Sequence, residues 1–594
     1  MELSLLCFLV PLLSSIVLAL PWKFSERTIS YVTLTTMMAS LFGVAFLFFM
    51  LVNQGFSPFE IHLPSITVSH HSFPLVFWID LYGVGYLLMS ILLGLIVVKF
   101  SHSYLHLEIG YQRYFSVILF FVFGLSLLSI AGHLDLFFAG WEIVGLSSFL
   151  LISFYRSHVR SVNNAWRVYC IYRICDIGLL SGAVLGHVMW KEATTFSVLN
   201  ELSVHQVQEY HSVAFLIFCL CLVIASFGKS AQFPFYNWPA KAMEGPTPSS
   251  AIFYGALSIH AGLLLLIRTQ VIWSSNFWAT GLIVGAGGMT FILSLLQKKV
   301  QTNIKGRIAY GITSQIGLMY ILLGLGLVEV VFIFMLLHAA FRCFQILISS
   351  SIVADSDLSN NKNVIAKIER RKTFMESLSM KLISTLYLFT SLDFGLNSFQ
   401  WKWIVSRLKS LVGGKFTGWS LLIAMILFLF IPLSDNYYYI SGASVLLAIR
   451  GLFYHRSPLH MIIDVIICLA GVLTSFALID HHALKVITDY LYPIFPALLA
   501  VLSIAYCFRE KDIRHFHGEG RIHTIKANIF LIAFMVISGM PVSSAFIAED
   551  IILESLIEHR PVLAVLTLFI LMLVGIILSK VYVRLFMGRA PMLT

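Results

Sequence analysis

The sequence predicts an all-α, polytopic integral membrane protein, and three observations carry that prediction. Of its 594 residues, 59% are hydrophobic and 11% are charged, whereas a soluble domain carries about 25% charged residues. The apolar residues gather in runs of roughly 20, the length of helix that crosses a bilayer. Ten-residue segments of alternating apolar and polar side chains, the pattern of outer-membrane barrels, do not occur.

The apolar runs predict about 16 to 18 transmembrane helices. Those of the first part are expected near residues 1–20, 29–52, 77–98, 114–132, 134–155, 168–190, 212–229, 247–268, 276–296, 308–326 and 328–353. Those of the second part are expected near residues 380–395, 418–434, 437–454, 459–479, 487–508, 526–545 and 562–588. Two charged stretches, 354–377 and 508–526, are too polar for lipid and are expected as loops or surface helices.

Charge and cysteine content exclude several classes of protein. The formal net charge is +10, but the basic residues fall in short clusters between apolar runs, as in cytoplasmic loops, so we expect no nucleic-acid partner. The eight cysteines form no CxxC pair, and no phosphate loop, haem-attachment motif or nucleophile elbow occurs. His102 and His106 have a metal-like spacing without further obvious ligands. We therefore expect no cofactor, no metal and no redox or hydrolytic site in this chain.

The apolar runs contain charged residues, and these are the candidate functional residues. A charge near the bilayer centre costs roughly 2.5 to 3.5 kcal/mol, so each needs a partner, a wet cavity or a function. Glu142 lies in "FFAGWEIVGLSSFLL", well inside a span. Lys229 ends an apolar run and is followed by Pro234, which removes a backbone donor and breaks the helix. Lys229 is interpreted either as a proton carrier beside a cavity or as a lysine that reaches from a helix end to the interface.

Histidines and one arginine form a second group of candidates. His338 and Arg342 are four residues apart and therefore share a helix face. Histidine exchanges protons near neutral pH, whereas arginine keeps its proton, so Arg342 can tune a neighbour but is a poor relay. His260 stands alone in an apolar run, where a hydrogen-bonded core histidine is the simpler interpretation.

A third group of candidates is a pair of carboxylates at the end of the run "FMVISGMPVSSAFIAED", which Gly539 and Pro541 interrupt. Glu549 and Asp550 are adjacent carboxylates at this break. They are interpreted either as the end of a proton path, with one of the two holding a proton, or as solvated residues at a helix end. Two separate breaks near buried charges are also typical of transporters with inverted repeats.

Four stretches resemble a known superfamily: "FFAGWEIVGLSSFLLISFY", "GKSAQFPFYNWPAKAMEGPTPSSA", "NIKGRIAYGITSQIGLM" and "LLHAAFRCF". They are similar to the antiporter-like subunits of respiratory complex I, above all its L-type subunit, to Mrp-type cation antiporters and to DAB-type inorganic-carbon transporters. The likeness runs from Phe77 to Val353 and returns at "SGMPVSSAFIAEDIIL". It implies two inverted five-helix repeats with broken helices, plus additional spans, and it places the breaks at Pro234, Pro248, Gly539 and Pro541.

The resemblance also implies a division of the chain and roles for its charges. The expected segments are N-terminal spans (1–110), an antiporter-like core (111–355), a polar loop with additional spans (356–525), and a core-completing broken helix with a C-terminal span (526–594). Glu142 and Lys229 match the superfamily's glutamate–lysine pair. The residues that match its further proton-path positions are His338, Arg342, Glu549 and Asp550, and His260, which appears six residues after Tyr254, is a further proton-path candidate. Arg342 and Glu549 stand where lysines are usual, and Tyr254 stands where a histidine is usual.

The expected function is translocation of protons or cations, coupled to a partner. An extra segment near 375–508, and a chain that stops soon after its last apolar run, favour the membrane subunit of an inorganic-carbon uptake complex. Its partner would be a separate, zinc-bearing protein similar to a carbonic anhydrase. The alternatives are a subunit of a complex I-like, Mrp or hydrogenase-linked complex, with other membrane subunits as partners, and a scaffold whose charges only join helices. The expected location is a bacterial inner membrane.

Overall fold

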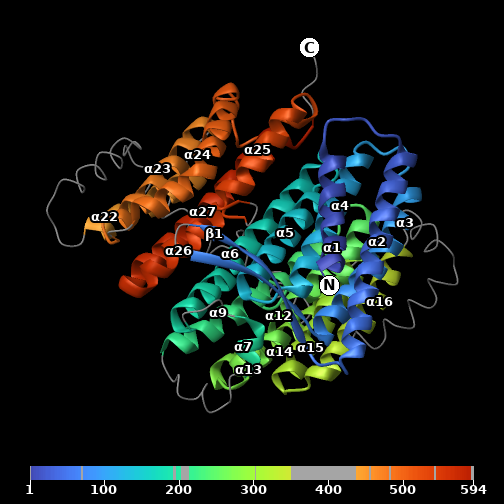
Figure 1. Cartoon of the computed structure of the whole chain (residues 1–594). Helices are drawn as coiled ribbons and strands as arrows, with labels where there is room; N and C mark the ends of the chain where they lie inside the picture. Colours follow the sequence, from blue (N-terminus) through green and yellow to red (C-terminus); the bar gives the residue numbers. More distant parts are fainter. Residues whose placement is uncertain are drawn as a thin grey trace, which may run out of the picture.

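The computed structural model describes residues 2–68, 71–190, 195–201, 213–301, 303–349, 436–453, 457–480, 483–540 and 543–589. These residues fold into a helical bundle with one small antiparallel hairpin (Figure 1). Eleven helices in the described ranges are long and apolar enough to cross a membrane, and α1, α9 and α25 are shorter apolar helices. The all-α, polytopic class is therefore confirmed. The spans expected near 380–395 and 418–434 lie outside the described residues.

The first part of the chain forms long helices at the predicted apolar runs, although α6 begins at Val159, nine residues before the run expected at 168–190. Their bounds are α1 Glu2–Ala19, α2 Glu26–Asn53, α3 Leu81–Tyr104, α4 Tyr111–Ile130, α5 Leu134–Ile152 and α6 Val159–Trp190. Side chains cap three of them: oxygens of Ser25 and Asp80 and the ring nitrogen Nδ1 of His133 accept hydrogen bonds from the first turns of α2, α3 and α5.

The hairpin was not predicted. Strands β1 (Phe59–Val68) and β2 (His71–Ile79) pair antiparallel between α2 and α3. The span expected at 77–98 was therefore wrong at its start, because the apolar residues Phe77–Ile79 belong to β2, and α3 begins at Leu81 after the cap Asp80. A strand pairing of this kind depends on a partner segment, which the apolar run alone does not reveal.

Helices are interrupted in the middle of the chain. Helix α9 (Val213–Lys229) ends at the predicted lysine, and the next residues turn through a cis Phe233–Pro234 bond into the short α10 (Trp238–Ala242). The span at 247–268 consists of α11 (Thr247–Ser250), the π-helix η1 (Ala251–Ala256), the 3₁₀ turn η2 (Ser258–His260) and α12 (Ala261–Arg268).

The structure confirms one predicted proline break and corrects another. Pro234 follows the end of α9, as expected. Pro248, predicted as a break, instead lies in the first turn of α11, where its missing N–H leaves no hydrogen bond unmade. The irregular backbone comes after it, in the π-helical residues Ala251–Ala256. Pro541 lies outside the described residues.

The remaining helices complete the bundle. Their bounds are α7 Phe196–Glu201, α13 Gln270–Ser274, α14 Phe277–Val300, α15 Ile304–Gly324, α16 Val328–Leu347, α22 Asn436–Phe453, α23 Pro458–Ala477, α24 Ala483–Cys507, η3 Glu519–Arg521, α25 Thr524–Ile537, α26 Ala545–His559 and α27 Pro561–Phe586. The single span expected at 526–545 was wrong, because α25 stops at Ile537 and a separate helix, α26, begins at Ala545.

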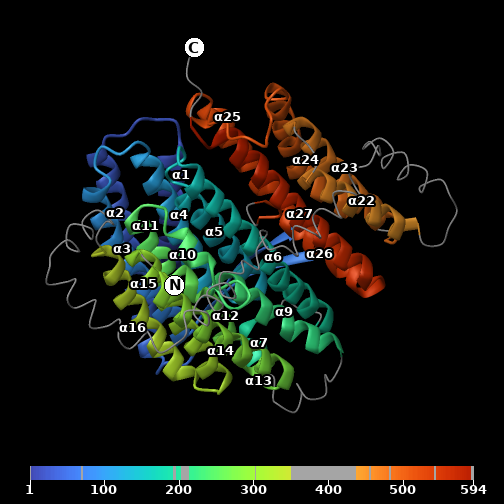
Figure 2. The ribbon, with the colours of Figure 1, turned by 180° about the vertical axis from the view of Figure 1, so that it is seen from behind.

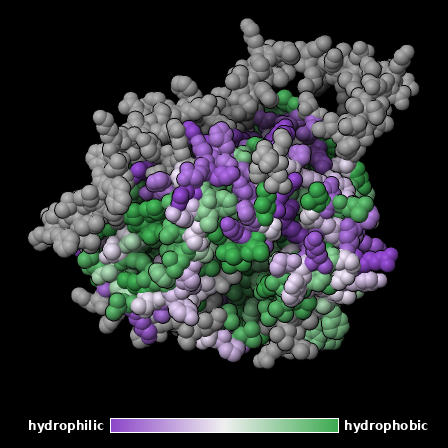
Figure 3. Space-filling view, turned by 90° about the horizontal axis from the view of Figure 1, so that it is seen from above, coloured by the Kyte–Doolittle hydropathy of each residue, from purple (hydrophilic) through white to green (hydrophobic). Residues whose placement is uncertain are grey.

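Two segments that carry candidate residues, α5 and the interrupted span Thr247–Arg268, are the most buried of the candidate membrane spans. The most apolar part of α5 is 94% buried and that of the interrupted span Thr247–Arg268 is 100% buried, against 33% for α14 and α24. Helix α27 packs against α6 on one side and against α22 and α23 on the other, so it joins the front helices to the additional ones (Figures 1 and 2). Hydrophilic and hydrophobic side chains both reach the surface at the end of the bundle drawn in Figure 3.

Candidate functional site

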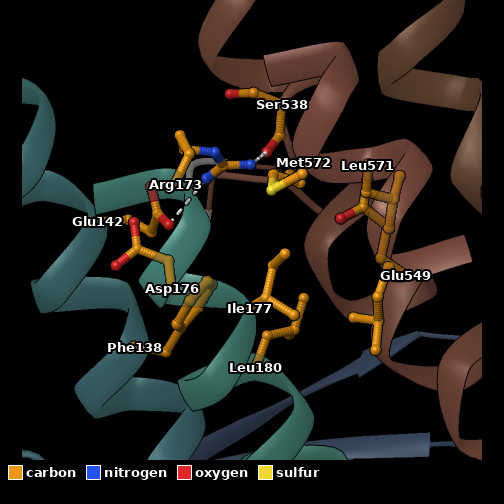
Figure 4. A pocket seen from close by; sticks show the side chains of 12 residues that line it. Phe138, Glu142, Arg173, Asp176, Ile177, Leu180, Ser538, Glu549, Leu571 and Met572 are labelled. Atoms are coloured by element: carbon orange, nitrogen blue, oxygen red, sulfur yellow. Dashed lines mark hydrogen bonds and ion pairs between the residues drawn. The ribbon is translucent and has the colours of Figure 1, made fainter. Parts of the chain in front are cut away.

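A small pocket in the bundle interior is lined by charged side chains from three helices. Glu142 comes from α5, Arg173 and Asp176 from α6, and Glu549 from α26 (Figure 4). All four residues are at least 90% buried. The other lining residues are apolar, apart from Ser538 and Gly539 in the connection between α25 and α26. Buried ionisable groups facing a shared space are what ion pathways in membranes require.

Glu142 has a partner that the sequence did not predict. Nη1 of Arg173 donates to Oε1 of Glu142 at 2.8 Å, and Nη2 donates to the carbonyl oxygen of Ser538 at 2.8 Å. Among the described residues, the ion pair of Glu142 is the one with Arg173. The proton-path roles expected for Glu142 and Lys229 stay a prediction. Arg173 also connects α6 to the interruption between α25 and α26.

Lys229 is fully enclosed, so the alternative of a lysine that reaches the interface is excluded. The residue is 1% exposed. Its Nζ donates to the carbonyl oxygen of Trp141 at 2.7 Å and lies 4.6 Å from the ring centre of Tyr172 and 5.1 Å from that of Trp141. A neutral carbonyl and two aromatic faces hold either the ammonium or the amine form, because none of them is a fixed negative charge.

Trp141 links Lys229 to Asp176. Its backbone carbonyl accepts from Lys229, and its indole Nε1 donates to Oδ1 of Asp176 at 2.5 Å. Asp176 in turn lines the pocket with Glu142, the neighbour of Trp141 in α5. One residue of α5 thus contacts both the lysine and the charged pocket.

Glu549 closes the other side of the pocket. The hydroxyl of Tyr490, from α24, donates to its Oε1 at 3.3 Å. Gly539 lies against the Glu549 carboxylate and has a φ of +69°, a left-handed conformation that glycine adopts without strain. The predicted break at Gly539 is thereby confirmed, and an additional helix, α24, contributes directly to the site.

We expect Gly539→Ala to destabilise the protein. The left-handed backbone costs a non-glycine residue roughly 1–2 kcal/mol, and the added Cβ would collide with the Glu549 carboxylate. Thermal unfolding in detergent measures the loss. The matched control is Gly281→Ala in α14, where a Cβ meets nothing within 4 Å and no loss of stability is expected. Equal melting temperatures for Gly539→Ala and wild type would contradict this account.

The predicted histidines meet at a separate place. Nε2 of His260 and Nδ1 of His338 are 3.0 Å apart, and Nδ1 of His260 lies 2.5 Å from the carbonyl oxygen of Ala256 in the π-helix. Because a carbonyl only accepts, Nδ1 of His260 carries a hydrogen, and in the neutral pair Nδ1–H of His338 donates to His260. His260 is 0% exposed, so the interpretation as a hydrogen-bonded core histidine is confirmed, and its second partner is another candidate, His338.

Arg342 and Asp550 have their own partners. Arg342 donates to the side-chain oxygens of Gln315 and Gln345, both neutral groups. Asp550 lies 3.2 Å from Nδ1 of His187, while its neighbour Glu549 faces the pocket. The two adjacent carboxylates thus belong to different groups of side chains and are held by different partners.

A predominantly helical membrane bundle that encloses ionisable side chains beside interrupted helices defines a class of polytopic membrane protein with charged groups in its interior. Residues 131–392 match the family model described as NADH:quinone oxidoreductase/Mrp antiporter, transmembrane region. This segment of the chain is similar to the antiporter-like superfamily, as are the L-type subunits of complex I.

Similar proteins support that assignment. The chain is 29% identical over 372 residues to NADH-quinone oxidoreductase subunit L of Buchnera aphidicola, covering 61% of this chain and 59% of that protein. It is 33% identical over 291 residues to NADH-ubiquinone oxidoreductase chain 5 of Paracentrotus lividus, covering 48% and 44%. The match thus spans about half the length of these relatives, 59% of the first and 44% of the second. A chain in the structure of the Mrp complex from Dietzia sp. shares the fold, with a TM-score of 0.51, 15% identity and coverage of 90% of this chain and 75% of that one.

Proposed function

We propose that this chain is a proton- or cation-translocating membrane subunit of a larger complex. The observation that carries the proposal is the row of buried ionisable groups from Lys229 through Asp176 and Glu142 to Glu549, placed where α9 ends and where α25 and α26 are interrupted. Burying so many charges is costly unless they pair or conduct. Lys229 is the basic, titratable group in this row, and its partners are neutral, so it is the proposed switch.

In this proposal, Lys229 gains and loses a proton as α5 moves. Trp141 is the connecting residue, because its carbonyl holds the lysine and its indole holds Asp176. A small shift of α5 changes both contacts together. One elementary charge crossing 100 mV corresponds to about 2.3 kcal/mol, enough to shift a proton equilibrium by more than one pH unit.

The proposed setting is a respiratory or Mrp-type membrane complex with other membrane subunits as partners. The support comes from the relatives, which are named as quinone oxidoreductase subunits, and from the Mrp complex whose chain shares the fold. The second candidate is the carbon-uptake subunit with a zinc-bearing partner. One observation favours it: Glu549 stands at a position where the superfamily usually has a lysine, and Tyr490 from the additional helix α24 holds it.

Affinity purification from native membranes separates the two settings. We expect the tagged chain to copurify, in a mild detergent, with further antiporter-like or quinone-oxidoreductase membrane subunits, identified by mass spectrometry. If the sole stable partner is a large soluble zinc protein, the carbon-uptake complex replaces the respiratory or Mrp-type complex as the proposed setting. A chain that purifies alone from intact membranes would contradict both.

A further inference from the structure

A second group of titratable side chains lies outside the pocket. Asp135 stands in the first turn of α5, His187 in the last turn of α6, and Asp550 in α26. Nε2 of His187 is 3.0 Å from Oδ2 of Asp135, and its Nδ1 is 3.2 Å from Oδ2 of Asp550. One ligand atom from each of the three residues lies within 4.8 Å of the other two. Two consecutive helices, α5 and α6, and the distant α26 therefore direct an imidazole and two carboxylates to one point.

The contacts in this group cannot all be favourable while its histidines are neutral and its carboxylates are charged, so an additional positive charge is needed. A neutral imidazole has one N–H, so it donates to one carboxylate and turns a lone pair toward the other. His133 adds to this requirement: its Nε2 faces the carbonyl oxygen of Pro74 at 2.7 Å, while its Nδ1 faces Oδ2 of Asp135 at 3.2 Å. With both histidines neutral, lone pairs face lone pairs. Either extra protons or a metal cation removes that repulsion.

A further buried oxygen points to a cation as well. Asp135 is 2% exposed, and within the described part of the chain its Oδ1 has no hydrogen-bond partner. Leaving a buried polar atom unsatisfied costs about 1–3 kcal/mol, and more for a charged group. A dication bound through both oxygens of this carboxylate would satisfy Oδ1 as well as Oδ2. The side chains of His187 and Asp550 are each 13% exposed, so the group is reachable from the surface.

We propose that Asp135, His187 and Asp550 form a binding site for a divalent transition-metal ion of the zinc type. Three protein ligands of the imidazole and carboxylate kind, with a fourth position left for water, are a usual zinc set. The imidazole favours such ions over Mg²⁺ and Ca²⁺, which take oxygen ligands. Binding replaces the proton shared between His187 and a carboxylate by the metal, and His133 keeps Asp135 in position from outside the ligand set.

The proposed metal site does not depend on the proposed transport function, because metal binding alone defines it. The sequence predicted no metal ligands in this chain, because the three residues are not close in sequence and show no ligand spacing. A bound ion would join α26 to α5 and α6, the helices that also line the pocket.

Metal titration of the full-length chain tests the proposal. The protein is purified in detergent, stripped with a chelator and titrated with ZnCl₂ by calorimetry, and bound zinc is counted after dialysis. We expect one tight site per chain, unaffected by excess Mg²⁺. His187→Ala and Asp550→Asn should each weaken zinc binding by about 10–100-fold or more. Removing even a residue that only hydrogen-bonds to a metal ligand costs that much. Co²⁺ added in place of zinc should give the visible absorption bands of a four-coordinate ion.

The control is His106→Ala, because His106 is also paired with a carboxylate, Glu26, at 2.7 Å but is exposed. Zinc binding should remain at the wild-type level in this variant. Equal zinc affinity in wild type and Asp550→Asn, or loss of the tight site in His106→Ala, would overturn the proposal. Asp550→Asn keeps the size of the side chain, so it decides the question even if His187→Ala does not fold.

Discussion

Replacing Lys229 by alanine is expected to abolish proton movement while the chain still assembles. The alanine removes the titratable group whose partners are the Trp141 carbonyl and two aromatic rings. Proton flux in proteoliposomes should fall about tenfold or more, which corresponds to roughly 1.4 kcal/mol or more of barrier. Lys299→Ala, at an exposed position in the last turn of α14, should leave the flux unchanged.

Lys229→Arg separates proton exchange from the mere presence of charge. Arginine keeps its proton, with a pKa above about 12, so we expect flux to be lost as in the alanine variant. Gly145→Ala keeps the Lys229 side chain but forces its ammonium group to move, because a Cβ at Gly145 would lie 2.7 Å from Nζ of Lys229. An arginine variant with full flux would show that the lysine serves as a fixed charge, contrary to the proposed switch.

Removing Arg173 is expected to have the largest effect on stability. The substitution Arg173→Ala leaves Glu142 as a buried carboxylate without its ion-pair partner and frees the Ser538 carbonyl. Breaking a buried pair by removing one partner costs about 3–5 kcal/mol. We expect a strongly lowered melting temperature in detergent and a smaller yield of assembled complex.

A double variant tests the reason for that loss. Combining Arg173→Met with Glu142→Gln removes both charges, and it should recover part of the stability that Arg173→Met alone loses, since no ion remains unpaired. Arg514→Ala, which breaks an exposed ion pair with Asp512, should leave the melting temperature unchanged. If Arg173→Met and the double variant are equally unstable, packing at Arg173 and not the charge pair is responsible.

The sequence predicted the helices and the position of the lysine well, because these depend on local pattern. An apolar run followed by Pro234 is sufficient to end α9 at Lys229. The same local signals predicted a break at Gly539, whose left-handed backbone needs glycine. They could not reveal the hairpin, since its strands are stable only through pairing with each other.

The partners of the charged residues were not predictable in the same way. Arg173 and Asp176 lie three residues apart in the apolar stretch "CIYRICDIGLL" of α6. A charged residue inside an apolar run is the same sequence signal that indicated Glu142. That Glu142 contacts Arg173 and not Lys229 depends on how α5, α6 and α9 pack. Tyr490 reaches Glu549 from α24, across 59 positions of sequence. Packing of distant segments decides such contacts, and a single sequence does not contain them.

Proton flux driven by an imposed membrane potential tests most directly whether this chain conducts protons through the membrane, as proposed. The purified complex is reconstituted into liposomes that contain a pH-sensitive dye, and a potassium gradient with valinomycin sets the voltage. The account predicts a change of internal pH that exceeds that of protein-free liposomes, reverses when the potential is reversed and is lost in Lys229→Ala. Internal pH that follows the protein-free control in both directions, or equal flux in wild type and Lys229→Ala, would contradict it.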